Sequence, residues 1–223
     1  MLRLSKERVR DEILNFISCL KSSKVIKVLS VPTFFDVIGL KVNDFVHINN
    51  LNKIKDNIDF DISIIFEFAL ALDKNEEIIS HLTMMRDLKF NKENIKFITE
   101  VLSFKVCNKI EIERSINLTI YKYGIEITKY MVINSWIWEN NSYELNDWKN
   151  LFKSIDDRNK LVFPIKPNDL INIGVPQGPK IGSLLNYLEE VWIGNNCDSS
   201  KEELIQLIER YLPTHNRGKG GQD

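Results

Sequence analysis

The chain has 223 residues, 43% of them hydrophobic, which is enough for the core of one large domain or two small ones. Thirty basic and 31 acidic residues give a net charge of −1, which excludes a strongly basic nucleic-acid-binding protein, so any RNA contact must come from a local patch. No apolar run approaches the roughly 20 residues that span a bilayer, and the three scattered cysteines fit reduced thiols, so we expect a cytoplasmic protein without a membrane partner.

The opening residues, Met1–Arg10, are too charged for a signal peptide and lead into a predicted helix that Ser5 can cap. Arg8 and Glu12 lie one turn apart and can form an ion pair, and Glu7 lies in the first turn, where negative charge is favoured. We interpret these three residues as a charged surface that braces neighbouring helices rather than as catalytic groups. The apolar face of this helix comprises Val9, Ile13, Phe16, Ile17 and Leu20.

A series of further helices is predicted up to residue 155. The most apolar is Ile62–Leu72, which is hydrophobic on nearly every side, as is typical of a helix in the middle of a bundle, and Asp61 can cap it. No convincing strand pattern appears, and short polar breaks join the helices, so the sequence predicts an all-α multi-helix bundle. The other predicted helices in this part cover residues 25–29, 33–39, 46–58, 76–86, 91–102, 108–120, 124–138 and 143–155.

Five aromatic residues gather near the middle of the chain. One of them could stack on an RNA base, because stacking on aromatic side chains is common in RNA recognition. Aromatic residues on an apolar helical face belong more often to the core, and this is the interpretation that we favour. The five are Tyr121, Tyr123, Tyr130, Trp136 and Trp138.

The stretch Phe163–Trp192 predicts a helical hairpin. Pro167 suits the first turn of a short helix, and Gly174 can end that helix in a left-handed conformation. After a Gly/Pro-rich turn, Pro179 can begin a longer helix. The apolar stripe of the longer helix comprises Ile181, Leu184, Leu185, Leu188 and Trp192.

The turn of this hairpin offers a seat for a backbone phosphate. The amides after Gly178 stand at a helix N-terminus, and Lys180 and Lys166 add ammonium groups nearby. Arg158 and Lys160, in the charged connector before the hairpin, could extend this patch. The alternative is a tight αα-hairpin held by its glycines, with no ligand, and the pattern alone favours this interpretation.

Signatures of catalysis are missing from the sequence. Asp59-Phe60-Asp61 contains a D-x-D pair, but it lacks a glycine-rich lead-in and flanking strands, so we interpret it as a turn and helix cap. No phosphate-binding loop, G-x-S-x-G elbow or C-x-x-C pair occurs, so neither a metal site nor a catalytic residue is predicted. The histidines are isolated from one another: His47, His81 and His215.

One long ungapped run in the hairpin reads F-P-x-K-x-x-D-L-x-x-x-G-x-x-x-G-P-x-I-G-x-L-L-x-x-L-E-E-x-W. It comprises Phe163, Pro164, Lys166, Asp169, Leu170, Gly174, Gly178, Pro179, Ile181, Gly182, Leu184, Leu185, Leu188, Glu189, Glu190 and Trp192. This run resembles the C-terminal region of bacterial class II tRNA nucleotidyltransferases, the CCA-adding enzymes and their poly(A) polymerase relatives. The opening Leu4–Leu14 is similar to the family's L-S-x-E-R-I-x-x-E-L motif, which carries Glu7, Arg8 and Glu12 and braces the neck of the enzyme.

The resemblance implies an all-α architecture with a bundle body and a small C-terminal helical hairpin tail, as in the poly(A) polymerase C-terminal region. We therefore expect a neck remnant helix at 1–22, a helical body at 23–157, a helical tail domain at 158–212 and a flexible end at 213–223. The charged connector at 156–160 also favours the boundary between body and tail.

The resemblance also implies a function. In the family, body and tail hold the acceptor stem and T-arm of tRNA, while the D-x-D, R-R-D and E-D-x-x-R motifs belong to an N-terminal catalytic head. This sequence lacks those motifs, which implies a tRNA-binding part without its head, inactive alone and with no DNA partner. Magnesium and CTP or ATP would belong to the head, which we expect on a separate polypeptide.

A physical reason also favours such a partner, because the apolar face at Val9, Ile13 and Phe16 is expected to lack a cover on one side. Two alternatives stay open at this point. The chain could be a decayed remnant without a present role, or a helical protein-interaction module that reuses an RNA-binding scaffold.

Overall fold

The computed structural model describes residues 5–20, 46–138, 144–158 and 161–209 of the chain. Within these ranges it contains ten helices and no sheet, which confirms the predicted all-α bundle. None of these helices is long and apolar enough to cross a membrane. The helices predicted at 25–29 and 33–39, the candidate Lys160 and the expected flexible end at 213–223 lie outside the described residues.

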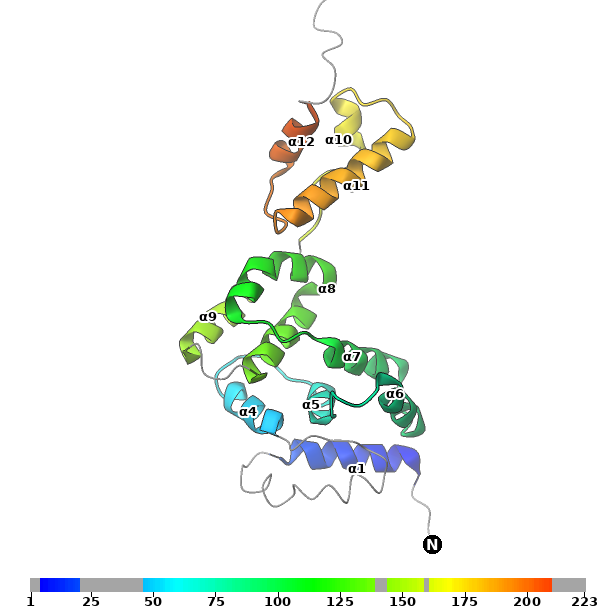
Figure 1. Cartoon of the computed structure of the whole chain (residues 1–223), viewed down its shortest axis with the longest axis vertical. Coiled ribbons are helices and arrows are strands. Elements are labelled where there is room, and N and C mark those ends of the chain that lie inside the picture. Colours follow the sequence, from blue (N-terminus) through cyan, green and yellow to red (C-terminus); the bar gives the residue numbers. More distant parts are fainter. Residues whose placement is uncertain (1–4, 21–45, 139–143, 159–160, 210–223) are drawn as a thin grey trace, which may run out of the picture. The chain divides into compact units, whose positions relative to one another are not determined.

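The chain divides into two compact units, and helix α8 contributes to both. Helix α8 (Lys109–Trp138) is interrupted at Gly124, whose φ of 82° and ψ of 169° are not helical (Figure 1). Glycine adopts this conformation with little strain because it lacks a Cβ atom. The expected segmentation into neck, body and tail stays a prediction. The first unit consists of Met1–Ile112 and Glu126–Asp157, and the second of Glu113–Ile125 and Arg158–Asp223.

Helix α5 (Ile64–Ala71) is the centre of the first unit. Its residues Phe66, Phe68 and Ala69 have no exposed surface, because neighbouring helices cover it on several sides. This confirms the prediction of a buried central helix within 62–72. The helices that pack against it are α1 (Lys6–Ser18), α4 (Val46–Lys55) and α7 (Lys92–Ser103).

The start of α5 corrects one prediction. Ser63, rather than Asp61, is the N-cap, and its Oγ accepts a hydrogen bond from the N–H of Ile65 at 3.2 Å. Asp61 is exposed two residues upstream, too far from the first turn to cap it. The N–H of Ser63 donates to the hydroxyl of Tyr130 at 3.1 Å. Because Tyr130 is buried, this member of the predicted aromatic group belongs to the core, as favoured.

Helix α1 has its apolar face covered within the first unit. Ile13 and Ile17 are buried, and α5 packs against α1. The expectation that Ile13 lacks a cover was therefore wrong, while Val9 and Phe16 are half-buried. An uncovered α1 face consequently gives no argument for a separate partner polypeptide.

Arg10, rather than the predicted charged trio, connects α1 to the rest of the first unit. Its Nη1 donates a hydrogen bond to the carbonyl oxygen of Lys89 at 2.7 Å, and its guanidinium lies 5.9 Å from the ring centre of Phe90. Glu7, Arg8 and Glu12 are all exposed, and no ion pair joins Arg8 to Glu12, although the structure describes both. Arg10 was missed because only its contact 79 residues away distinguishes it from its neighbours.

The remaining helices of the first unit are α6 (Ile78–Asp87) and α9 (Leu145–Asp156). Helix α9 buries Trp148, which stacks on the half-buried Trp136 with ring centres 5.9 Å apart, so Trp136 packs against the core. Lys129 of α8 is buried, with its ammonium 5.0 Å from the ring centre of Phe60, and it forms an ion pair with Asp156.

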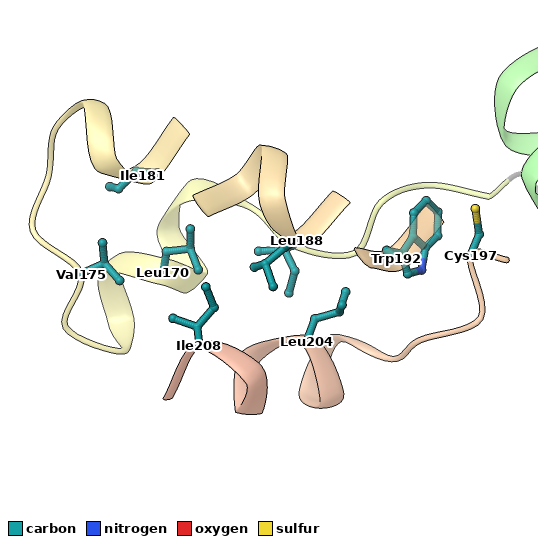
Figure 2. Packing of buried hydrophobic residues seen from close by; sticks show 9 residues of the cluster. Leu170, Val175, Ile181, Leu188, Trp192, Cys197, Leu204 and Ile208 are labelled. Atoms are coloured by element: carbon teal, nitrogen blue, oxygen red, sulfur yellow. The ribbon is translucent and has the colours of Figure 1, made fainter. Parts of the chain in front are cut away.

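The second unit is built on α10 (Pro167–Asn172), α11 (Pro179–Gly194) and α12 (Lys201–Glu209). Figure 2 shows side chains from all three helices meeting in one core. The stretch Glu113–Ile125 adds Leu118 and Tyr121 to it. Its buried members are Ile165, Leu170, Val175, Ile181, Leu188, Trp192, Cys197, Leu204 and Ile208.

Candidate nucleic-acid interface

The candidate site is the hairpin formed by α10, the turn after it and the beginning of α11. Pro167 occupies the first turn of α10, as predicted. The side chain of Asp169 accepts a hydrogen bond from the N–H of Lys166 at 2.8 Å, which fixes the chain where it enters the helix. Lys166 itself is exposed, so its ammonium is available at the entrance of the hairpin.

Gly174 ends α10 in a Schellman motif. Its φ is 93°, and its N–H donates to the carbonyl oxygen of Ile171 at 2.9 Å. The N–H of Val175 donates to the carbonyl oxygen of Leu170 at 3.0 Å, which completes the motif. The predicted left-handed end of the short helix is therefore confirmed. Val175 is buried, so the motif also anchors the turn to the core of the second unit.

Gly178 is the N-cap of α11, and it has no side chain with which to cap the helix. Its φ of 149° is a conformation that residues with a Cβ atom rarely adopt. Pro179 has no N–H and the N–H of Ile181 donates to the carbonyl oxygen of Gly178 at 3.1 Å, so the N–H of Lys180 is the free amide that follows. Pro179 occupies the first helical position, and Lys180 next to it is exposed. A Cβ atom added at Gly178 or Gly182 would meet no atom within 4 Å, so this end of α11 has an open surface.

The other two candidates for phosphate contact have different surroundings. Arg158 is half-buried, and its Nη1 donates a hydrogen bond to Oδ1 of Asn117. The Nδ2 of Asn117 in turn donates to Oδ1 of Asp198, so the guanidinium is part of a polar chain inside the second unit. Lys160 lies outside the described residues. Lys166, Gly178 and Lys180 are thus the candidates that the structure places on the exposed hairpin.

Asp169 also connects the hairpin to α12. Its Oδ1 lies 2.6 Å from the Nζ of Lys201. The hydrogen bond from Lys201, followed by that from the backbone of Lys166, lowers the pKa of Asp169 below its ordinary value. Lys201 forms an ion pair with this carboxylate, and the charge of Lys166 also attracts it. Lys180 is the hairpin lysine without such an interaction among the described residues, and Lys166 is exposed without a close ion pair.

Tyr121 is held by the second unit and is not available for stacking on RNA. Its hydroxyl donates a hydrogen bond to Glu189, and its ring meets that of Trp192 edge-on with ring centres 4.9 Å apart. The hydrogen bond to Glu189, together with burial, raises the pKa of Tyr121 to about 12. Tyr123, two residues further along, is 55% exposed.

The turn after α11 ties this helix to Glu113–Ile125. Asn196 and Cys197 both have left-handed backbone angles, with φ of 54° and 59°. The side-chain oxygen of Asn196 accepts a hydrogen bond from the N–H of Leu118 at 3.3 Å. Sequence reasoning missed this contact, although Asn is one of the few residues other than glycine that tolerates such a conformation.

The described residues contain no group of three or more His, Cys, Asp or Glu side chains that could hold a metal ion. Asp59 and Asp61 are both exposed. A surface groove of about 450 Å³ occurs in the first unit, lined by Lys6 and by residues of α6 such as Ile79 and Thr83. It contains none of the candidate residues of the hairpin.

The comparison with protein families identifies the chain over most of its length. The model for tRNA nucleotidyltransferase domain 2 matches residues 59–208, which include α5 to α11 and nearly all of α12. The match contains the candidate hairpin but not the opening motif with Glu7, Arg8 and Glu12. No protein with a curated function matches the chain. Since the family model covers more than half of the sequence, the chain belongs to the tRNA nucleotidyltransferase family.

Proposed function

We propose that this chain is the tRNA-binding part of a tRNA nucleotidyltransferase. It holds the acceptor stem and T-arm in the cytoplasm while nucleotides, up to a complete CCA, are added to the 3′ end. The observation that carries the proposal is that the family match includes a hairpin whose Lys166 and Lys180 are exposed and form no close ion pair within the described residues. Ammonium groups beside the free N–H of Lys180 at the start of α11 suit a backbone phosphate.

The mode of binding follows from the charge of the chain and the shape of RNA. The deep major groove of an A-form helix hides its base edges, so proteins contact duplex RNA through its phosphates and 2′-hydroxyl groups. With a net charge of −1, the chain has no overall electrostatic attraction for RNA. The attraction must therefore come from a local group of positive charges such as the two lysines. Binding through these lysines is expected to depend strongly on salt and weakly on sequence.

The chemistry is proposed to come from a catalytic head that acts together with this chain as a separate polypeptide. Nucleotide transfer needs carboxylates that hold divalent metal ions, one to activate the attacking hydroxyl and one to stabilise the leaving pyrophosphate. The resemblance assigns these carboxylates, the magnesium ions and the CTP or ATP site to the head. The role of this chain is to orient the tRNA so that its 3′ end reaches that site.

The first test is binding of a tRNA transcript to the full chain, measured by filter binding over a range of salt concentrations. The double variant K166A/K180A should bind more weakly, and each lost phosphate contact should reduce the salt slope by about 1. The matched control is K92A/K96A, which removes the same charge from exposed positions of α7. Absence of tRNA binding by the wild-type chain at low salt would refute the proposal and favour a decayed remnant.

The second test concerns the head. A separately produced catalytic head of the family, with magnesium, CTP and ATP, should extend tRNA more efficiently when this chain is added. Binding of tRNA without any gain in extension would contradict the proposed cooperation with a separate head while leaving the tRNA-binding role intact. Capture of a protein partner through the hairpin, without tRNA binding, would favour a protein-interaction module instead.

A further inference from the structure

Helix α11 exposes an aromatic ring that the second unit does not use. Tyr187 is 48% exposed, while Leu188 next to it is fully buried. Among the described residues, no ring packs against Tyr187 and no group forms a hydrogen bond with its hydroxyl. Tyr121 is the contrasting case in the same unit, since its ring contacts Trp192 and its hydroxyl bonds Glu189. About half of the Tyr187 side chain is therefore presented to solvent.

Tyr187 and Lys180 lie on the same face of α11. Seven residues are close to two full turns, so the two side chains are separated by a rise of about 10.5 Å along the helix. Ser183, three residues after Lys180 and four before Tyr187, lies between them on this face and is small and exposed, so no large side chain at this position separates the two. A strand can thus lie along this face and touch both ends.

The charges at the two ends of this face of α11 determine at which end a phosphate can bind. The ammonium of Lys180 and its free backbone N–H at the start of α11 attract a phosphate at the N-terminal end. Glu190, one turn beyond Tyr187, is exposed and repels a phosphate at the other end. The nearest phosphate of a strand whose base reaches Tyr187 therefore belongs on the Lys180 side.

We infer that Tyr187 stacks on an unpaired nucleobase of the tRNA, with the neighbouring backbone phosphate at Lys180. The inference rests on the proposed tRNA binding and adds to it the residue that contacts a base. The base must be unpaired, since the bases of an A-form duplex are stacked inside the helix and only loops, bulges and ends offer a free face. Stacking on tyrosine tolerates any base, which suits a protein that accepts many tRNAs.

The packing of α11 around Tyr187 favours stacking, because a helix that is already rigid loses little conformational freedom when a base binds. On either side of Tyr187 along α11, Ile181, Leu188 and Trp192 are buried in the core of the second unit (Figure 2). The helix is therefore fixed, and only the tyrosine side chain has to be ordered when RNA binds. Few degrees of freedom are lost, because tyrosine has two side-chain torsions.

The experiment measures the affinity of the full chain for a tRNA transcript and for a fully paired RNA duplex of similar length, at several salt concentrations. Y187A should weaken tRNA binding roughly 5- to 100-fold and leave the salt slope unchanged, because a lost stack removes no ionic contact. K180A should instead reduce the slope by about 1. Y187F, which keeps the ring, should bind like the wild type, and Y187A should not change duplex binding.

The matched control is Y123A, because Tyr123 is an exposed tyrosine of the same unit that lies on α8 rather than on this face. Equal affinities of Y187A and the wild-type chain for tRNA would overturn the inference. So would equal losses in Y187A and Y123A, in Y187A and Y187F, or in tRNA and duplex binding. Failure of the wild-type chain to bind tRNA would instead refute the proposed function itself, so the two failures are distinguishable.

Discussion

Asp169 and Lys201 join α10 to α12 through an ion pair, with Oδ1 and Nζ 2.6 Å apart. The same carboxylate accepts the N–H of Lys166 through its other oxygen at 2.8 Å. One side chain therefore fixes the entrance of the hairpin and connects it to the last described helix. This ion pair therefore stabilises the position of the hairpin that carries the proposed tRNA contacts.

The first prediction concerns the pH dependence of this pair. The pKa of Asp169 is lowered in the folded chain, so its contribution to stability is fully present above the unfolded pKa of about 3.9. That contribution is lost as the pH falls from there through the lower folded value. D169N should therefore reduce the melting temperature at pH 7 and have a smaller effect near pH 3, as followed by circular dichroism.

A matched variant removes the pair from its other side. K201A keeps the bond from Lys166, and the amide oxygen of D169N can also accept this bond, so the two variants should lower the melting temperature by similar amounts at pH 7. Near pH 3 the two variants should approach the wild type. A pH-independent loss in D169N would show that the charge of Asp169 does not contribute.

The second prediction concerns Tyr121 and Glu189. The folded pKa of Tyr121 is raised to about 12, against an ordinary value of 10.0. A raised pKa means that the stabilisation is complete below the unfolded value and disappears as the pH rises toward the folded one. Y121F should lower the free energy of unfolding by roughly 1–2 kcal/mol at pH 8, because it removes a hydrogen bond to a carboxylate.

Denaturant unfolding of Y121F and the wild type at pH 8 and at pH 11 provides the measurement. The difference between them should shrink at the higher pH, where the phenol of the unfolded wild type is ionised. Y123F serves as the control, since Tyr123 is exposed, and it should unfold like the wild type at both pH values. A difference between Y121F and the wild type that grows with pH would contradict the assignment.

The local parts of the fold were predictable from the sequence, because the spacing of apolar residues and the positions of Gly and Pro at helix ends act within a few residues. The buried helix α5, the break at Gly124 and the hairpin from Pro167 to Trp192 all follow from such patterns. The cap of α5 was misplaced because Asp and Ser are both good N-caps, and only the backbone decides which of them precedes the first turn.

The polar contacts of the second unit were not predictable in this way. Asn117 and Asp198 are 81 residues apart, and Tyr121 and Glu189 are 68 residues apart. No local spacing encodes such pairs, since they arise only when Glu113–Ile125 meets α11 and the turn after it. For the same reason, the sequence alone predicts a phosphate contact for Arg158 and does not reveal the hydrogen bond from its guanidinium to Asn117.

The third prediction contrasts three glycines of the hairpin. Gly174 and Gly178 have positive φ, whereas Gly182 is helical with open space around it. G174A should destabilise the chain by about 1–2 kcal/mol, because a Cβ atom in the left-handed region meets the following carbonyl oxygen. G178A should also destabilise it. G182A should stabilise the free chain by up to about 1 kcal/mol, since alanine is the better helix former.

Urea unfolding of the three variants checks these values. A stabilising effect of G174A would contradict its role in the Schellman motif. Because Gly182 lies about 200° around α11 from Lys180, G182A should bind tRNA like the wild type and serves as a control for the face that carries Lys180 and Tyr187.

The fourth prediction concerns the charged face of α1. Arg10 donates to the carbonyl oxygen of Lys89, a residue with a left-handed φ of 59° at the end of α6, and it lies near the ring of Phe90. R10A should therefore lower the free energy of unfolding by about 1–2 kcal/mol, because it removes a hydrogen bond from a charged donor. R8A, on the same helix but exposed, should change the free energy of unfolding by less than about 0.5 kcal/mol.

Urea unfolding of both variants distinguishes them, and a larger loss in R8A than in R10A would support the predicted bracing role of Glu7, Arg8 and Glu12. R10K tests the geometry, since lysine keeps the charge but not the planar guanidinium that reaches both the carbonyl and the ring.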